Sequence, residues 1–477
     1  LNIIHFLMYT SYHKINEFDI AFFKSILAES SILIAENELL EFASDYTEDL
    51  VFLPDLVLKP QTVQQVSEIL GYCNTHHISV TPRGAGTGLS GGSLPIHGGI
   101  SLCMTLMDAI LDLDVNNMMA TVQPGIINEA FQQHIAAHGL FYPPDPASKG
   151  SCQLGGNVAH SGGGPRALKY GTTKDYILNL QIVLPEGTIM WTGANTLKNS
   201  TGYNLTQLMI GSEGTLAVVT AIVVKLIPLP KYDLSLMAGF SSAIDACACV
   251  SHIFLAGVSP SALEFMEVDA LRLSILHTGS SYSPIAGAEA FLLIELNAHK
   301  HAELEDQAAL VYEVLEQYNV IDVEVADTEN QKGILWGLRR KIGEAVKLSS
   351  IYKEEDTVVP RHSLPILLQR VKEIGSRYHF SSICYGHAGD GNLHVNIMKG
   401  NMNDEDWDTK LIFGIREIFG VCKQLKGTIS GEHGIGLVQK SYLDIVFDPI
   451  HFKLMRGIKR VFDPNNILNP SKIFDLE

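Results

Sequence analysis

The chain has 477 residues, and with 46% hydrophobic and 18% charged residues its composition predicts a folded protein of two or three domains rather than a disordered one. Its 52 acidic and 34 basic residues give a net charge of −18, which disfavours nucleic acid as a partner. The seven cysteines form no Cys-x-x-Cys ladder, which argues against an internal iron–sulfur cluster and indicates a reducing, cytoplasmic environment.

The first ten residues are apolar, but the run is shorter than a membrane span and no small-residue cleavage site follows it. We therefore expect neither a signal peptide nor a transmembrane segment, while a peripheral position at the inner face of a membrane stays open. The chain begins with Leu1, so whether residues 1–7 belong to the native protein, with Met8 as the true start, also stays open. Residues 11–50 show a helical pattern, and residues 1–50 are predicted to form an N-terminal helical arm.

From Pro54 onward the pattern changes to a strand, a helix over residues 63–74 capped by Thr62, and a second strand over residues 78–81. The most glycine-dense segment of the chain follows. Consecutive backbone N–H groups without Cβ atoms form nests that bind pyrophosphate, although a structural glycine turn is the alternative for this segment alone. The third glycine of the nicotinamide motif G-x-G-x-x-G is missing, so NAD is not predicted. The candidate ligand-binding residues here are Arg83, Gly84, Ala85, Gly86, Thr87, Gly88, Gly91 and Gly92.

Two further glycine clusters follow, separated by a hairpin predicted over residues 183–192 and followed by a strand over residues 217–227. Three glycine-rich loops, each attached to a strand, indicate an extended ligand with a pyrophosphate and a planar ring system, because such a ligand needs several close backbone approaches. The candidate residues of these clusters are Pro144, Asp145, Gly155, Gly156, Asn157, Ser161, Gly162, Gly163, Gly211, Glu213, Gly214, Thr215 and Leu216.

These loops resemble the FAD-binding domain of the vanillyl-alcohol oxidase/p-cresol methylhydroxylase family over about residues 54–230. Within that family the whole chain resembles the D-2-hydroxyacid dehydrogenases. The resemblance implies an FAD-binding domain of two α/β subdomains over residues 51–230. It also implies non-covalent FAD, because Gly86-Thr87-Gly88 stands where some relatives carry a flavin-linking His.

A second domain is predicted to begin after the proline-rich punctuation at residues 228–230. Strands are expected over residues 234–240, 263–266 and 291–296, and helices over residues 243–256, 302–318 and 364–378. This alternation predicts an α+β fold, and the resemblance implies a cap domain, residues 231–455, whose antiparallel sheet, covered by helices, faces the flavin. Residues 456–477, with Asn469 as a further FAD contact, resemble the closing segment that returns to the FAD domain.

Residues 383–396 predict a β-hairpin with a turn at residues 388–391. His387 lies at the edge of the turn, and His394 and Asn396 share a face of the return strand. Two imidazoles and a carboxylate from elsewhere can form a three-ligand metal site. The hairpin motif and the later Glu432-His433-Gly434 are similar to segments of the D-2-hydroxyacid dehydrogenases in which the equivalents of His387, His394 and Glu432 hold a divalent metal. The ligand set suits Zn²⁺, with Mn²⁺ or Fe²⁺ as alternatives.

Oxidation of a 2-hydroxy acid requires a base for the hydroxyl proton, and His433 is the candidate; orientation of the metal site is its alternative role. Arg339, expected at a helix start, matches the family's carboxylate-binding arginine, whereas Arg340 and Lys341 are expected on the surface. Lys353 either faces the substrate or flavin or lies in an acidic loop. Asn396 either binds substrate or supports His394, and Lys440 either lies beside the flavin or pairs with Glu432.

The resulting prediction is an FAD-dependent, metal-assisted dehydrogenase of small D-2-hydroxy acids, with hydride transfer to flavin N5. Gly343 stands where relatives acting on D-2-hydroxyglutarate carry Thr, which favours D-lactate or glycolate as substrate. Electrons would pass to a separate iron–sulfur subunit or a quinone, and a homodimer is expected. The alternatives are a transferase of the alkylglycerone-phosphate synthase type and a D-2-hydroxyglutarate dehydrogenase; a flavin-free metallohydrolase would leave the three glycine loops unexplained.

Overall fold

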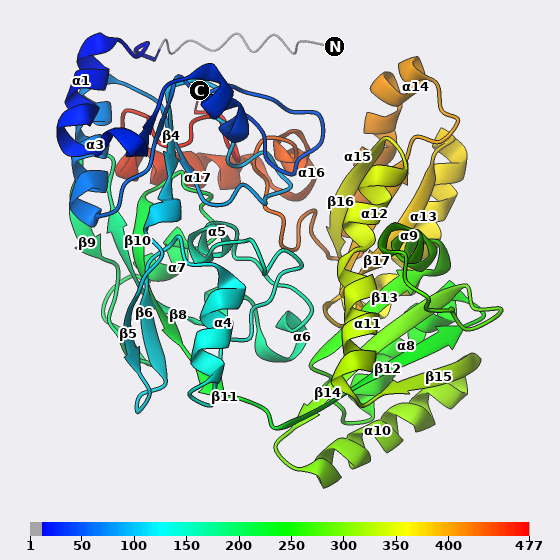
Figure 1. The fold of residues 1–477 in the computed structure, drawn as a ribbon. Helices are drawn as coiled ribbons and strands as arrows, with labels where there is room; N and C mark the ends of the chain where they lie inside the picture. Colours follow the sequence, from blue (N-terminus) through cyan, green and yellow to red (C-terminus); the bar gives the residue numbers. More distant parts are fainter. Residues whose placement is uncertain (1–11, 477) are drawn as a thin grey trace.

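The computed structural model describes residues 12–476, so the predictions about residues 1–10 lie outside the described residues. The chain forms two lobes (Figure 1): the first contains the N-terminal half and the C-terminal helix α17 (Pro449–Phe462), and the second contains the segment between them. Among residues 12–476, no helix is both long and apolar enough to cross a membrane.

The first part of the first lobe is a four-stranded sheet in the order β1 (Ile32–Leu33), β2 (Leu56–Leu58), β4 (Ile100–Cys103) and β3 (Val80–Arg83). Strands β2, β4 and β3 run parallel, and their apolar side chains pack with helices α1 (Glu17–Ile26) and α3 (Val63–His76). The predicted cap of α3 is confirmed: the Thr62 hydroxyl accepts the Gln65 N–H, and the Gln65 side chain accepts the Thr62 N–H.

The prediction of a helical arm is wrong for most of residues 12–50. Only α1 is a full helix; α2 (Glu36–Leu39) is a single turn, and β1 pairs with β2 at the edge of the sheet. Side chains of this segment, such as Phe23 and Ile32, are buried in the core of the first lobe. The segment is therefore part of the lobe, because its apolar residues are covered by the sheet and α3 rather than by each other.

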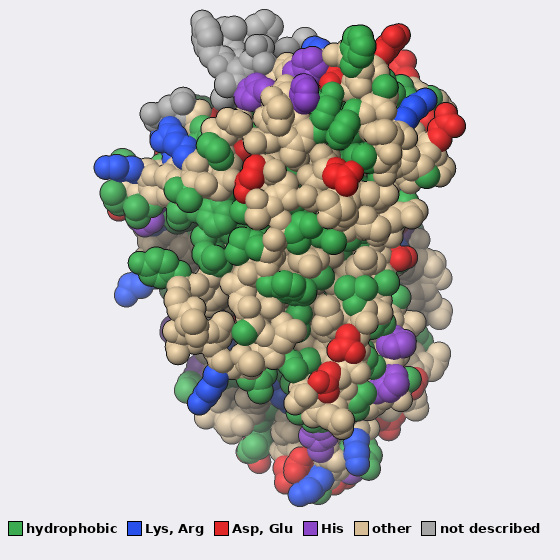
Figure 2. Space-filling model, turned by 90° about the vertical axis from the view of Figure 1, so that its left-hand side faces the viewer, with side chains coloured by type: hydrophobic (Ala, Val, Ile, Leu, Met, Phe, Trp, Pro, Cys, Tyr) green, Lys and Arg blue, Asp and Glu red, His purple; other side chains and the backbone are tan. Residues whose placement is uncertain are grey.

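The second part of the first lobe is an antiparallel sheet in the order β5 (Ile110–Asp114), β6 (Met119–Val122), β10 (Val218–Lys225), β8 (Ile177–Val183) and β9 (Ile189–Trp191). The predicted hairpin is confirmed, since β8 pairs with β9 through Val183 and Ile189. The helices of this part are α4 (Asn128–Ala136), α5 (Leu154–His160), α6 (Ala167–Tyr170) and α7 (Leu205–Met209), and β7 (Leu140–Phe141) pairs with β11 (Ile227–Pro228). Figure 2 shows the outer face of this lobe, where hydrophobic side chains gather across the middle.

The second lobe is built on a seven-stranded antiparallel sheet. The strand order is β15 (Val320–Ala326), β12 (Tyr232–Phe240), β14 (Ala290–Ala298), β13 (Ala262–Glu267), β17 (Ser381–Gly386), β18 (Asn392–Met398) and β16 (Tyr352–Val358). One face packs on α8 (Ala243–Leu255), α10 (His301–Leu315), α13 (Leu364–Tyr378) and α15 (Leu411–Gln424), and the other on α9 (Val268–Thr278), α11 (Glu329–Arg340) and α12 (Ile342–Ser349). Helices α14 (Asp404–Thr409) and α16 (Leu443–Val446) complete this lobe.

The predicted strands and helices of the second lobe, including the hairpin of β17 and β18, are confirmed to within a few residues. The C-terminal segment returns to the first lobe, where Leu468 forms a parallel bridge with Val80. The Asn469 amide donates to the carbonyls of Gly92 and Glu213, so this segment fastens two of the glycine loops to each other.

Candidate active site

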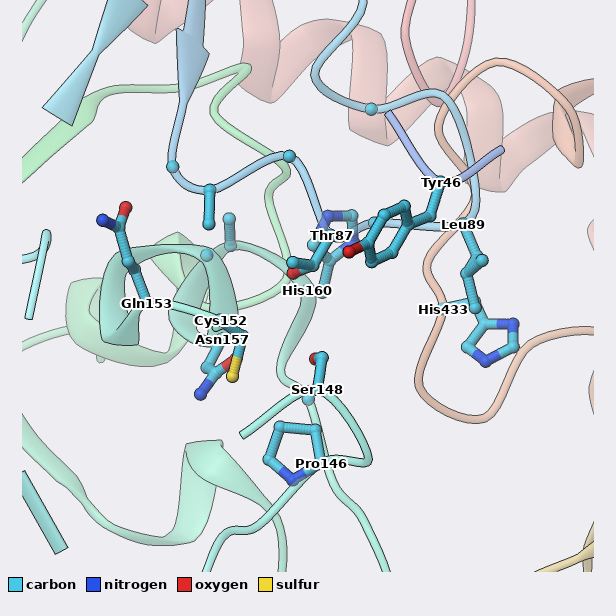
Figure 3. A pocket seen from close by; sticks show the side chains of 18 of the residues that line it. Tyr46, Thr87, Leu89, Pro146, Ser148, Cys152, Gln153, Asn157, His160 and His433 are labelled. Carbon is cyan, nitrogen blue, oxygen red and sulfur yellow. The ribbon is translucent and has the colours of Figure 1, made fainter. Parts of the chain in front are cut away.

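A cavity of about 1000 Å³ lies between the two lobes and is lined by residues from both. All three glycine clusters reach it, and so do the hairpin histidines and the loop that carries Glu432. Figure 3 shows part of the lining, with Thr87 and Asn157 of the first two clusters and His433 labelled. The candidate cofactor residues that line it are Arg83, Gly84, Ala85, Gly86, Thr87, Gly88, Gly92, Gly155, Gly156, Asn157, Gly162, Glu213 and Gly214.

The glycine loops form an open cradle along this cavity. Gly86 has a φ of +71°, and a Cβ there would collide with the guanidinium of Arg83, so the turn requires glycine. A Cβ on Gly156, at the start of α5, would meet nothing within 4 Å. Gln153 Oε1 is buried beside this turn without a hydrogen-bond partner among the described residues. A buried acceptor of this kind is expected where a bound ligand supplies the hydrogen-bond donor. The site therefore fits FAD.

The other candidate cofactor residues are not among those that line the cavity. The Pro144 carbonyl accepts hydrogen bonds from Asn128 and Gln132, and the Asp145 carboxylate pairs with Arg166 at 3.2 Å. These contacts hold the loop before Pro146 in place. The candidates that do not line the cavity are Gly91, Pro144, Asp145, Ser161, Gly163, Gly211, Thr215, Leu216 and Asn469.

At the second-lobe end of the cavity, the three predicted metal ligands come together. Glu432 Oε1 lies 3.1 Å from His387 Nε2 and 3.8 Å from His394 Nε2, and the three ligand atoms lie within 4.8 Å of one another. His387 Nδ1 lies 2.9 Å from both oxygens of Glu264, which leaves Nε2 as the nitrogen that faces Glu432. A carboxylate behind an imidazole is the usual support of a metal-binding histidine, so the donor set fits a divalent ion.

The electrostatics of these groups follow from their proximity. Burial opposes ionisation of Glu432, but His387 outweighs it and lowers the pKa of Glu432 to about 2. Burial and the charge of His433 lower the pKa of His394 to about 3. Burial also opposes the charge of His433, but Asp356 and Glu354 outweigh it and raise the pKa of His433 above its ordinary value. The His433 ring stacks on His394 at 5.1 Å and lines the cavity.

Two acidic residues of β16 that sequence reasoning missed organise this end of the cavity. Asp356 Oδ2 accepts the backbone N–H groups of Gly431, Glu432 and His433 at 2.7, 2.8 and 2.9 Å. Glu354 lines the cavity itself, and burial raises the pKa of Glu354 to about 7. The available signal was the period-two alternation of a strand, which places Tyr352, Glu354 and Asp356 on one face.

The same alternation corrects the prediction for Lys353. Lys353 pairs in register with Ile397, whose side chain packs in the core on the far face of the sheet, and Lys353 does not line the cavity. The alternative of an acidic loop is also wrong, because the segment is strand β16. Asn396 pairs in register with Glu354; it is fully buried beneath the cavity lining, and both of its amide atoms lack hydrogen-bond partners among the described residues.

The cationic candidates are arranged differently from the prediction. Arg339 lies at the end of α11 rather than at a helix start; its Nη2 lies 2.6 Å from Glu264, and its guanidinium lies 5.0 Å from the centre of the Tyr385 ring. Arg340 is not a surface charge, since it lines the cavity and lies 3.6 Å from Asp145. Lys341 is exposed, as expected, and also lies at the cavity lining. Lys440 neither pairs with Glu432 nor lines the cavity, because it binds Asp475 and the Ser471 carbonyl.

The glycine-lined cavity and the two-lobed α+β fold define a flavoprotein. The FAD binding domain model matches residues 54–193, and the model of the FAD linked oxidases, C-terminal domain, matches residues 229–473. A solved structure of p-cresol methylhydroxylase with substrate bound superposes with a TM-score of 0.77 at 15% identity, covering 96% of this chain and 96% of that chain, which shows the fold. The chain belongs to the FAD-linked oxidase family.

Within that family, a D-lactate dehydrogenase of Anaerostipes hadrus is 36% identical over 97% of this chain and 98% of its own. Glycolate oxidase subunit GlcD of Bacillus subtilis is 36% identical, covering 91% and 92%, and a D-2-hydroxyglutarate dehydrogenase of Stutzerimonas stutzeri is 31% identical, covering 94% and 97%. The chain is thus an FAD-linked oxidoreductase of the D-lactate, glycolate and D-2-hydroxyglutarate dehydrogenase kind.

Proposed function

We propose that this protein oxidises a small D-2-hydroxy acid, D-lactate or glycolate, to the 2-keto acid, with a divalent metal at His387, His394 and Glu432. One observation carries the proposal: the metal-type cluster, the His433 imidazole and the Arg339 guanidinium line the same cavity as the glycine loops. FAD, when bound along those loops, supplies the acceptor for the hydride from substrate C2, and the metal, when bound, supplies a Lewis acid that acidifies the substrate hydroxyl.

The chain's own residues provide binding and proton transfer. The planar Arg339 guanidinium, whose Nε has no hydrogen-bond partner among the described residues, binds the substrate carboxylate. The His433 imidazole takes the hydroxyl proton, and the raised pKa of His433 favours holding it. Asp356 fixes the backbone of the loop that carries both Glu432 and His433, so one strand residue positions a proposed ligand and the proposed base together.

The electron acceptor we propose is a separate iron–sulfur subunit or a quinone, with the protein working as a homodimer in the cytoplasm or at the inner face of a membrane. The proposal is supported by the name of the Bacillus subtilis relative, which describes that chain as a subunit of a larger enzyme. The transferase alternative is disfavoured, since the three relatives described above, each more than 30% identical over most of this chain, are named as dehydrogenases and an oxidase subunit.

The test is anaerobic mixing of the purified protein with D-lactate, L-lactate, glycolate or D-2-hydroxyglutarate while the absorption of the oxidised flavin is followed. We expect bleaching by D-lactate or glycolate, loss of bleaching in His433→Ala, and loss on chelation with recovery on addition of Zn²⁺ or Mn²⁺. The exposed His362→Ala is the matched control and should bleach like the wild type. A yellow protein that none of the four acids bleaches would refute the proposed function.

A further inference from the structure

Glu354 is a buried carboxyl group in the cavity wall that the reaction described above does not use. Its side chain is 8% exposed, and its Oε1 lies 3.7 Å from His394 Nδ1 and 3.4 Å from the Tyr385 hydroxyl. It lines the cavity and lies two residues along β16 from Asp356, the register partner of His394, on the same face of the strand. Glu354 therefore lies beside the cluster at which the substrate hydroxyl is proposed to bind.

Side chains of both signs line the cavity. Besides Glu354 of β16 they include Arg339 and Arg340 of α11, Lys341 between the two helices, and Lys347 and Glu344 of α12. The other charged residues that line the cavity are Arg83, Glu129, Lys149, Glu213 and Glu432. Among residues 12–476, no Lys or Arg nitrogen lies within 4.0 Å of the Glu354 carboxylate; its basic neighbours are the imidazoles of His394 and His433, whose ligand atoms lie within 4.8 Å of it. The Tyr385 ring lies between Arg339 and Glu354: its face carries the Arg339 guanidinium, and its hydroxyl points to Glu354.

The space next to Tyr385 is also limited. A Cβ on Gly343, at the start of α12, would lie 3.1 Å from the Tyr385 hydroxyl, so that hydroxyl already fills the room between β17 and α12. Tyr385 and Glu354 form the stretch of wall between the two proposed anchors, since the Tyr385 ring lies 5.0 Å from the Arg339 guanidinium and Glu354 lies 3.7 Å from His394. At Glu354 itself the wall presents an acidic group, with no Lys or Arg nitrogen within 4.0 Å of it among the described residues.

We infer that Glu354, backed by Tyr385, restricts this site to 2-hydroxy monocarboxylates and excludes 2-hydroxy dicarboxylates. The inference rests on the proposed function and names its substrate class. A second carboxylate needs a cation or a pair of donors. Glu354 supplies neither in either of its protonation forms, since a carboxylate only accepts and a carboxylic acid donates once. Glu354 therefore disfavours a dicarboxylate, because the second carboxylate would lose its water without gaining a cation or a pair of hydrogen-bond donors.

The test compares D-lactate with D-2-hydroxyglutarate in the wild type, Glu354→Gln and Glu354→Lys, by the second-order rate of flavin bleaching. A binding readout that needs no turnover is the dissociation constant of pyruvate and of 2-oxoglutarate, followed by perturbation of the oxidised flavin spectrum. We expect the wild type to prefer the monocarboxylate by about 100-fold or more in both readouts. Glu354→Lys should shift the ratio toward the dicarboxylate by about tenfold or more, and Glu354→Gln by a smaller factor.

Lys353→Met is the matched control, because it changes a charge on the same strand but on the opposite face, and it should leave both ratios unchanged. If Glu354→Lys does not fold, Glu354→Gln carries the test alone, since it preserves the shape of the side chain. A wild type that takes both acids equally, or a ratio that neither variant moves by more than twofold, would overturn the inference. A protein that binds neither keto acid and is bleached by no hydroxy acid would instead refute the proposed function.

Discussion

Replacing Asp356 by Asn should weaken metal binding, because one carboxylate anchors the loop that carries Glu432 and His433. A hydrogen bond to an ionised acceptor contributes about 1.5–3 kcal/mol and a neutral one about 0.5–1.5 kcal/mol. Asp356 Oδ2 accepts three backbone N–H groups, so neutralising it removes about 1 kcal/mol from each bond, about 3 kcal/mol in all.

The side-chain amide of Asp356→Asn also cannot satisfy the hydrogen-bond donors on both sides of residue 356. Asp356 Oδ1 accepts the Asn392 Nδ2–H at 2.7 Å, so in Asp356→Asn either this donor or the three backbone donors must face an NH₂ group. The loop can escape the conflict only by moving, and movement takes the Glu432 carboxylate away from His387 and His394. Substitution of a residue that holds metal ligands in place typically lowers metal affinity by about 10–100-fold.

The assay is competition for Zn²⁺ or Mn²⁺ with a chelator, together with the FAD content and the melting temperature of each variant. We expect Asp356→Asn to raise the metal dissociation constant about 10–100-fold while FAD content stays near that of the wild type. Asp408→Asn, at an exposed position, is the matched control. Ser430→Ala, which removes one weaker bond of 3.1 Å to the same oxygen, should have a smaller effect in the same direction. Wild-type metal affinity in Asp356→Asn would refute the reasoning.

Three further outcomes are expected. Arg166→Met removes a bidentate partner of the buried Glu295, with bonds of 3.1 and 3.2 Å between the lobes, and should cost about 3 kcal/mol of unfolding free energy at pH 7. Although burial opposes ionisation, Arg166 lowers the pKa of Glu295 below 4.5; denaturant titrations should therefore show the full cost above pH 4.5 and a shrinking cost as the pH falls through the lowered value. Thr62→Ala should lower stability by about 1 kcal/mol in the same titrations, whereas Thr62→Ser should not. Gly343→Ala should raise the KM for the hydroxy acid more than it lowers kcat, because its Cβ displaces the Tyr385 hydroxyl from the substrate wall; an unchanged KM would contradict the wall described above.

The parts of the fold that were predictable from the sequence are those encoded in short windows. The period of two in residues 383–396, together with a glycine turn, predicted the hairpin that brings His387 and His394 to one site. Thr62 and Gln65 mark the start of α3 within four residues. The glycine loops were predictable because a nest needs small residues at fixed spacings.

Predictions that required the surroundings of a residue failed or stayed incomplete. Arg340 and Lys341 were both predicted to lie on the surface, because they are adjacent charged residues. In the structure Arg340 lies 3.6 Å from the buried Asp145, whereas Lys341 is exposed. The pattern over residues 11–50 predicted helix, but among residues 12–50 only α1 is a full helix, and side chains such as Phe23 and Ile32 are buried in the core of the first lobe. Helix propensity contributes less than about 1 kcal/mol per residue, so tertiary contacts readily override it.

The sequence by itself determined the local motifs of this protein: three glycine loops, a histidine hairpin and a Glu-His pair. Each could be identified because its residues are neighbours in the chain. Only the tertiary structure decided how these parts support one another. Glu264 stands behind His387 although 123 residues separate them, and β16 places Asp356 under the Glu432 loop while it turns Lys353 away. Register and packing between distant strands set these contacts, and a shift of one residue along β16 would exchange the two faces.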